Sequence, residues 1–199
     1  MNTSTFSLRS AYDDLDLSVL AISPETSPKA VVQFAHGMCD YKESYVPFME
    51  FLCPKGYACI IHDHRGHGAS VKSAEDLGYF YSGGYEAVVS DMLTVNEHAR
   101  QMFPGCPVYL FGHSMGSLAV RSFTKRYDSH IDGLVVCGSP SRNPAAGAGK
   151  MLAKIIAALK GERHRPALIQ KIAFDGLNKR FSSEGPNAWL SNDKENVLS

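Results

Sequence analysis

The chain has 199 residues, 44% of them hydrophobic, and it balances 20 lysines and arginines against 20 aspartates and glutamates. This apolar content is that of an ordinary globular protein, so we expect one domain, or one domain with a sub-domain, and little disorder. The formal net charge of zero argues against a dedicated nucleic-acid binder, because such proteins depend on clustered lysine and arginine.

The cysteine pattern and the N-terminal residues predict the cellular compartment of the protein. Five cysteines, an odd number, are scattered without C-x-x-C spacing, at positions 39, 53, 59, 106 and 137. Free thiols in a reducing cytoplasm explain this pattern better than a disulfide scaffold or a zinc knuckle. No apolar stretch follows a basic start, and no run approaches the roughly 20 apolar residues of a membrane span. We therefore expect a cytoplasmic protein without a signal peptide.

Strand-like and helix-like segments alternate along the first two thirds of the sequence. Short apolar runs predict strands at residues 6–9, 15–22, 30–35, 58–61, 108–111 and 131–137. Helical spacing of apolar residues predicts helices at residues 44–54, 85–103 and 114–127. This alternation indicates right-handed crossovers, so the predicted fold class is α/β with a largely parallel sheet.

The composition changes after residue 140. Residues 141–149 are rich in proline, alanine and glycine, and a short helix is expected at residues 150–160. Its apolar residues share one face, which fits either packing against neighbouring helices or contact with an acyl chain or a membrane surface. A second helical segment is expected at residues 167–177, and the polar residues from 178 onward predict no further strand.

A candidate nucleophile lies between a predicted strand and a predicted helix. Residues Gly112-His113-Ser114-Met115-Gly116 match the G-x-S-x-G pattern. In this context the serine stands on a sharp turn at the carboxyl edge of the sheet, where the helix N-terminus stabilises a developing oxyanion. The alternative is that Ser114 only caps the helix.

A second motif, His36-Gly37-Met38, follows the predicted strand at residues 30–35. Gly37 allows the backbone to turn, so the Met38 N–H could pair with that of Met115 to hold a substrate carbonyl oxygen. The alternative is a simple glycine turn beside an incidental histidine.

Three histidines, His62, His64 and His67, raise the possibility of a zinc site, because H-x-H-x-x-H after a strand resembles metallo-β-lactamase-like ligands. That motif has an aspartate before its last histidine, whereas Gly66 stands here. We therefore expect no metal and no cofactor, and we expect Asp63 and Arg65 to tie strand ends together.

Three segments in order carry a family resemblance: FAHGM at residues 34–38, HDHRGHGAS at 62–70 and LFGHSMGS at 110–117. Together they resemble the α/β-hydrolase superfamily, and within it the monoacylglycerol lipase, lysophospholipase and serine aminopeptidase group. The resemblance implies a mostly parallel sheet flanked by helices, with residues 1–140 as the N-terminal part of the core and residues 141–199 as a helical cap. It implies that Ser114 is the nucleophile and that the amides of Met38 and Met115 form the oxyanion hole.

The sequence departs from this family in its acid and base. In the superfamily the order is serine, aspartate, histidine, and the last two follow the cap. Neither a credible triad aspartate nor a credible triad histidine is found downstream of Ser114, where the candidates are Asp128, His130, Asp132, His164, Asp175 and Asp193. We therefore expect an N-terminal portion of a hydrolase, truncated inside or just after the cap, without the terminal strands.

The leading hypothesis is a serine hydrolase of carboxylic esters, acting on an acyl lipid such as a monoacylglycerol or a lysophospholipid through an acyl-enzyme on Ser114. One alternative is an inactive fragment or binding module, because the triad aspartate and histidine are not found. Another is a hydrolase of small peptide amides. Expected partners are a small acyl ester or lipid and, transiently, a membrane surface, but no nucleic acid.

Overall fold

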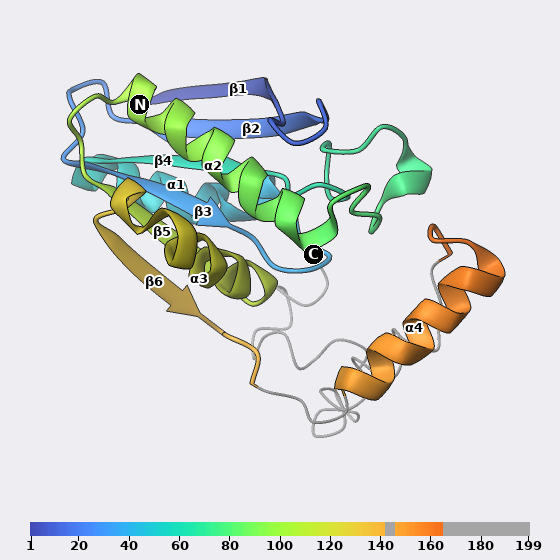
Figure 1. The fold of residues 1–199 in the computed structure, drawn as a ribbon. Helices are drawn as coiled ribbons and strands as arrows, with labels where there is room; N and C mark the ends of the chain where they lie inside the picture. Colours follow the sequence, from blue (N-terminus) through green and yellow to red (C-terminus); the bar gives the residue numbers. More distant parts are fainter. Residues whose placement is uncertain (142–145, 165–199) are drawn as a thin grey trace, which may run out of the picture. The chain divides into compact units, whose positions relative to one another are not determined.

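The computed structural model describes residues 1–141 and 146–164. They belong to two compact units, Met1–Arg142 and Asn143–Ser199, which are described separately. In the first unit a six-stranded sheet has helices on both faces (Figure 1).

The sheet has the order β1-β2-β4-β3-β5-β6. Its strands are β1 (Asn2–Arg9), β2 (Asp16–Ser23), β3 (Ala30–Ala35), β4 (Tyr57–His62), β5 (Val108–His113) and β6 (Gly133–Cys137). The pairs formed by β4, β3, β5 and β6 are parallel, whereas β1 with β2 and β2 with β4 are antiparallel. The prediction of a mostly parallel α/β sheet is confirmed.

Three α-helices and four 3-10 turns connect these strands. The α-helices are α1 (Val46–Leu52), α2 (Gly84–Met102) and α3 (Met115–Tyr127). The 3-10 turns are Lys42–Tyr45, Cys53–Lys55, Ala74–Asp76 and Asp128–His130. The helix expected at residues 44–54 is therefore shorter, because Pro54 lacks an amide donor and Gly56 turns the chain at a φ of 92°.

Apolar side chains fill the space on both faces of the sheet. Phe34 and Ile61 pack with Met49 of α1 on one face. On the other face Leu110 packs with Met92 of α2 and Phe123 of α3. The continuous apolar runs of β3 and β4 are explained by this burial on both sides.

In the second unit the structure describes one helix, α4 (Ala146–Lys160). It begins four residues before the predicted helix, since the alanine and glycine residues at 146–149 form its first turn. Met151, Ile155 and Leu159 share a stripe and are 65%, 52% and 80% exposed. The segment expected at 167–177 and the tail after it lie outside the described residues.

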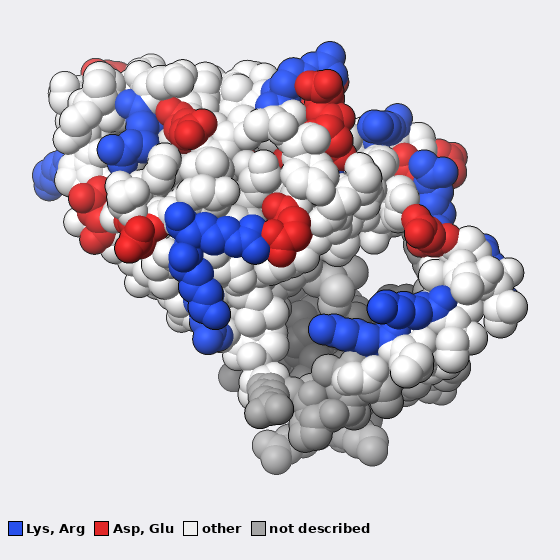
Figure 2. All heavy atoms as spheres, viewed as in Figure 1, with Lys and Arg blue, Asp and Glu red and all other residues white. Residues whose placement is uncertain are grey.

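Surface charge and helix length bear on possible partners. Figure 2 shows basic and acidic side chains interspersed over the viewed face of the first unit, in keeping with the balanced composition. Within the described ranges, no helix combines the length and the hydropathy that crossing a bilayer requires.

Candidate active site

Ser114 occupies the sharp turn between β5 and α3. Its backbone has φ 52° and ψ −116°, a region that residues other than glycine rarely adopt and that costs on the order of 1–3 kcal/mol. The turn is held from both sides: the Ser114 amide donates to the Cys137 carbonyl at 3.0 Å, and the Ser117 amide donates to the Ser114 carbonyl at 3.0 Å. The surrounding structure therefore forces this conformation on the serine.

The two glycines of the motif allow α3 to approach the sheet. A Cβ on Gly116 would lie 2.0 Å from the Ala35 carbonyl oxygen of β3. A Cβ on Gly112 would lie 2.6 Å from both the Gly116 carbonyl oxygen and Val120 Cγ2. Side chains at either position would push the helix away from β3 and β5, so the spacing of the motif is a packing requirement.

The structure brings the second motif next to the first. Gly37 follows the end of β3, and a Cβ on it would contact Ser114 Cβ at 3.4 Å. Met38 comes next and its side chain is half exposed. Among the described residues, no acceptor is hydrogen-bonded to the amide of Met38 or of Met115.

His113 lies beside the serine and is exposed. If Gly37 carried a Cβ, that atom would lie 3.4 Å from His113 Nδ1. A Cβ on Gly138 would lie 3.2 Å from His113 Nε2. The imidazole thus fits between the two loops that flank Ser114, and the absence of side chains on both glycines makes room for it.

Beneath the Gly37 turn, four histidines pack together. His36, His62 and His64 are fully buried, and His67 is 6% exposed. The ring of His64 lies 4.3 Å from that of His36 and 4.9 Å from that of His62, between centroids. Burial lowers the pKa of His36 to about 4 and that of His62 to about 3, and it lowers the pKa of His64 and His67 as well.

These histidines do not make a metal centre in the described part of the chain, where no group of three or more potential ligand side chains has suitable geometry. The sequence suggested zinc only through the spacing of His62, His64 and His67. The structure also places His36 in this histidine cluster. From the sequence alone, we expect His36 to be only supporting or incidental.

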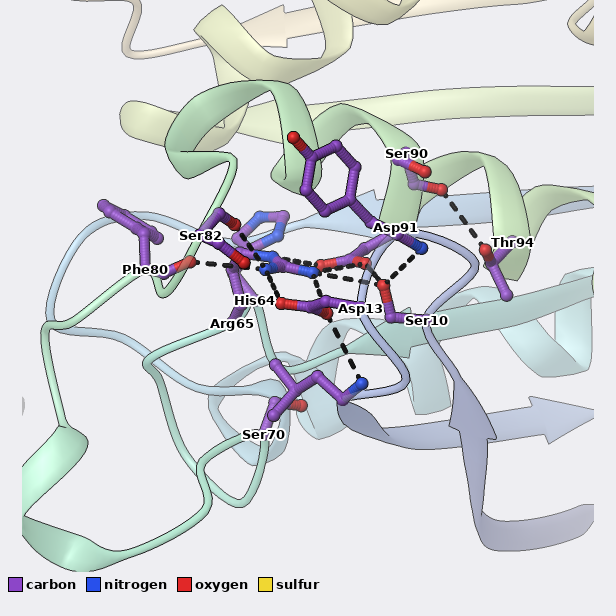
Figure 3. A network of polar contacts seen from close by, with 12 residues as sticks. Ser10, Asp13, His64, Arg65, Ser70, Phe80, Ser82, Ser90, Asp91 and Thr94 are labelled. Atoms are coloured by element: carbon purple, nitrogen blue, oxygen red, sulfur yellow. Dashed lines mark hydrogen bonds and ion pairs between the residues drawn. The ribbon is translucent and has the colours of Figure 1, made fainter.

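The charged residues of the loop after β4, expected to tie strand ends together, are buried and ion-paired. Figure 3 shows the buried Arg65 guanidinium between Asp91 of α2 and Asp13 of the turn after β1. Arg65 Nε donates to Asp91 Oδ2 at 2.7 Å, and its two terminal nitrogens contact Asp13 at 3.0 Å. Asp63 accepts from the Lys42 amide at 2.7 Å and from its ammonium at 2.8 Å.

Sequence reasoning missed the partners of these residues. A usable signal exists for Asp91, because it stands one turn from Val88 and Val95 on the apolar face of a predicted helix. A carboxylate at such a position requires a buried partner.

Two candidate acids and a candidate base lie at the wrong edge of the sheet. The Asp132 carboxylate accepts from the Val108 amide at 2.7 Å, at the start of β5, and Asp128 and His130 lie in the adjacent 3-10 turn. Ser114 follows the other end of this strand, about 20 Å away. His164 belongs to the second unit, and Asp175 and Asp193 lie outside the described residues.

A family model described as serine aminopeptidase, S33, matches residues 26–198. Human monoglyceride lipase is 30% identical over 114 residues, which are 57% of this chain and 36% of that protein. Monoacylglycerol lipase of Mycolicibacterium smegmatis is 29% identical over 140 residues, covering 69% and 47%. A monoglyceride lipase homolog of Monkeypox virus is 36% identical over 95 residues, covering 47% and 32%. The chain thus spans about a third to a half of the length of these relatives.

Solved structures share the fold. A thermostable carboxyl esterase from Bacillus coagulans, crystallised with glycerol, superposes with a TM-score of 0.86 at 24% identity, covering all of this chain and 64% of the esterase. A lipase in its open form superposes with a TM-score of 0.84 at 27% identity, covering 99% and 64%. Since the family model matches residues 26–198, most of the sequence, this chain belongs to the serine aminopeptidase S33 family of α/β hydrolases.

Proposed function

We propose that this chain carries the nucleophile and the oxyanion hole of a carboxylic-ester hydrolase. The observation that carries the proposal is the backbone of Ser114, held at φ 52° at the junction of β5 and α3. A non-glycine residue keeps such a conformation only where the fold imposes it, and such strain concentrates at functional sites.

The chemistry follows from this placement. Ser114 Oγ attacks the ester carbonyl carbon, and the resulting oxyanion accepts hydrogen bonds from the amides of Met38 and Met115. The alcohol then leaves and the acyl group stays on Ser114 until water releases it. The serine proton must pass to a general base, and in the described part of the chain no histidine is hydrogen-bonded to Ser114 Oγ. No residue of this chain is proposed as the triad aspartate or histidine, in keeping with the prediction from the sequence.

An acyl lipid, such as a monoacylglycerol or a lysophospholipid, is the proposed substrate. The names of the relatives, monoglyceride lipases and a probable lysophospholipase L2 of Haemophilus influenzae, favour it. The description of the family model favours small amides as the second candidate. A cytoplasmic location and the lack of a nucleic-acid partner remain predictions from the sequence.

We also propose that residues 141–199 are the helical cap region and that α4 contacts acyl chains or a lipid surface. Its exposed stripe of Met151, Ile155 and Leu159 is accompanied by Lys150 and Lys154, which favour an anionic surface. Ile155→Asp should weaken co-sedimentation with anionic phospholipid vesicles while leaving the thermal midpoint unchanged. Equal co-sedimentation of both proteins would contradict the lipid contact.

A fluorophosphonate probe tests the nucleophile directly. Stoichiometric labelling that is lost in Ser114→Ala, and kept in Ser139→Ala, is the expected result, because Ser139 is an exposed serine after β6. The absence of labelling in the wild-type chain would favour the alternative, a chain that binds ligand or a partner without turnover. A panel of matched ester and amide substrates then separates the lipase from the peptidase interpretation.

A further inference from the structure

The peptide unit between Gly37 and Met38 is held by the side chain of His36. This imidazole is fully buried directly after β3, and both of its nitrogens have partners. Nδ1 lies 2.7 Å from the Gly37 carbonyl oxygen, and Nε2 lies 2.8 Å from the amide nitrogen of His64.

These two contacts determine where the imidazole proton resides. A backbone amide can only donate, so the Nε2 atom of His36 accepts from His64. A neutral imidazole has a single N–H, which must then be on Nδ1 and points at the Gly37 carbonyl. Burial keeps the ring neutral by lowering the pKa of His36 to about 4.

The hydrogen bond to the carbonyl also orients the amide on the other side of the same peptide. The Gly37–Met38 peptide bond is trans, so the Gly37 C=O and the Met38 N–H point in opposite directions. With the carbonyl directed into the buried histidine cluster, the Met38 amide is directed away from it.

We propose that His36 is a positioning residue for the oxyanion hole: its Nδ1–H fixes the Gly37 carbonyl, and through that peptide it aims the Met38 amide at the oxygen bound beside Ser114. The His64 amide is the element that sets the required tautomer. This proposal rests on the proposed function of Ser114 and Met38, but its physical content is a hydrogen bond that can be measured in the unliganded chain.

The tautomer is measured first, in the unmodified protein. Uniform ¹⁵N labelling of histidine distinguishes a protonated ring nitrogen from a bare one, and the proposal requires Nδ1–H for His36 near neutral pH. An Nε2–H tautomer for His36 would overturn it, because Nδ1 would then have no proton to donate. This measurement does not depend on any variant being folded.

A second measurement observes the peptide itself. Methionine follows glycine only once in the sequence, at Gly37–Met38, so glycine labelled with ¹³C at its carbonyl and methionine labelled with ¹⁵N give a single cross-peak. His36→Asn can keep an N–H near the Nδ1 position, whereas His36→Gln keeps an acceptor near Nε2 and loses the donor. We expect the Gly37 carbonyl resonance to move upfield in His36→Gln and to stay close to wild type in His36→Asn. Equal shifts in both variants, or none in His36→Gln, would overturn the proposal.

The rate at which the fluorophosphonate probe labels Ser114 tests whether the hydrogen bond from His36 to the Gly37 carbonyl affects the reaction. Loss of one oxyanion donor lowers rates by roughly 10²–10³-fold, so His36→Gln should be labelled up to about 10²-fold more slowly than wild type. His36→Asn should lose much less, although both variants remove buried ring atoms. If the wild-type chain is not labelled at all, the proposed function of Ser114 fails, while the tautomer and the carbonyl shift still decide the role of His36.

Discussion

The imidazoles of His36, His62, His64 and His67 pack against one another with at most 6% exposure, and their burial makes the protein sensitive to acid. Burial disfavours the charged form, so the pKa of His36 falls to about 4 and that of His62 to about 3. The pKa values of His64 and His67 are lowered for the same reason. All four rings are therefore neutral in the folded protein near pH 7.

Unfolding exposes these rings and restores a histidine pKa of about 6.5. Because the folded pKa lies below the unfolded one, the unfolded chain binds more protons below about pH 6.5, and stability is lost as the pH falls. Between about pH 7.5 and about pH 5.5 each such histidine costs a little over 1 kcal/mol, so His36 and His62 together cost about 3 kcal/mol. His64 and His67 add to this loss. Against a typical stability of about 5–15 kcal/mol the effect is large.

Urea unfolding at these two pH values, followed by circular dichroism, measures the loss. His62→Gln and His62→Phe both remove one titrating ring, one with a polar and one with an apolar replacement. Each variant should lose roughly 1 kcal/mol or a little more of the pH-dependent difference, whatever its own stability. A wild-type unfolding free energy that is equal at both pH values, or variants that keep the full difference, would refute the reasoning.

Three further variants test the packing and strain around the site by urea unfolding. Gly116→Ala should destabilise the protein by about 1–3 kcal/mol, because its Cβ would meet the Ala35 carbonyl, whereas Gly147→Ala, with open space around it, should not. Arg65→Met should cost about 3–5 kcal/mol by leaving the buried Asp91 carboxylate unpaired, and a loss below 1 kcal/mol would contradict the network. Ser114→Gly should raise the unfolding free energy by up to about 1 kcal/mol, since glycine relieves the positive φ, and a decrease would argue against strain at the turn.

Local sequence patterns predicted those parts of the fold that local burial determines. The strand at residues 30–35 is predicted with its observed limits, because burial on both faces makes it apolar except at Gln33, whose side chain bonds to Met92 and Asn96 of α2. Residues 2–5 of β1 were not predicted as strand. They pair with β2 at the edge of the sheet with their side chains exposed, so no alternation of polar and apolar residues marks them.

The candidate site also has parts that the sequence predicted and parts that it could not predict. Ser114 and its flanking glycines could be predicted, because the strained turn and the close approach of the helix require particular residues at fixed spacing. The histidine cluster and the partners of Arg65 could not, since they join segments far apart in the sequence. Asp13 and Asp91, for example, meet only because α2 packs on the face of the sheet next to the turn after β1.

The order of the strands is what turns two separate motifs into one site. The sequence predicts that β3 and β5 are parallel, but it does not predict that they are neighbours. In the structure Ala35 is paired with Gly112, so the residues that follow each strand, Gly37 and Ser114, emerge side by side. Gly116 lets α3 lie against the end of β3, because a Cβ there would meet the Ala35 carbonyl oxygen. A residue with a Cβ at position 116 should therefore separate the Met38 amide from Ser114 as well as destabilise the fold.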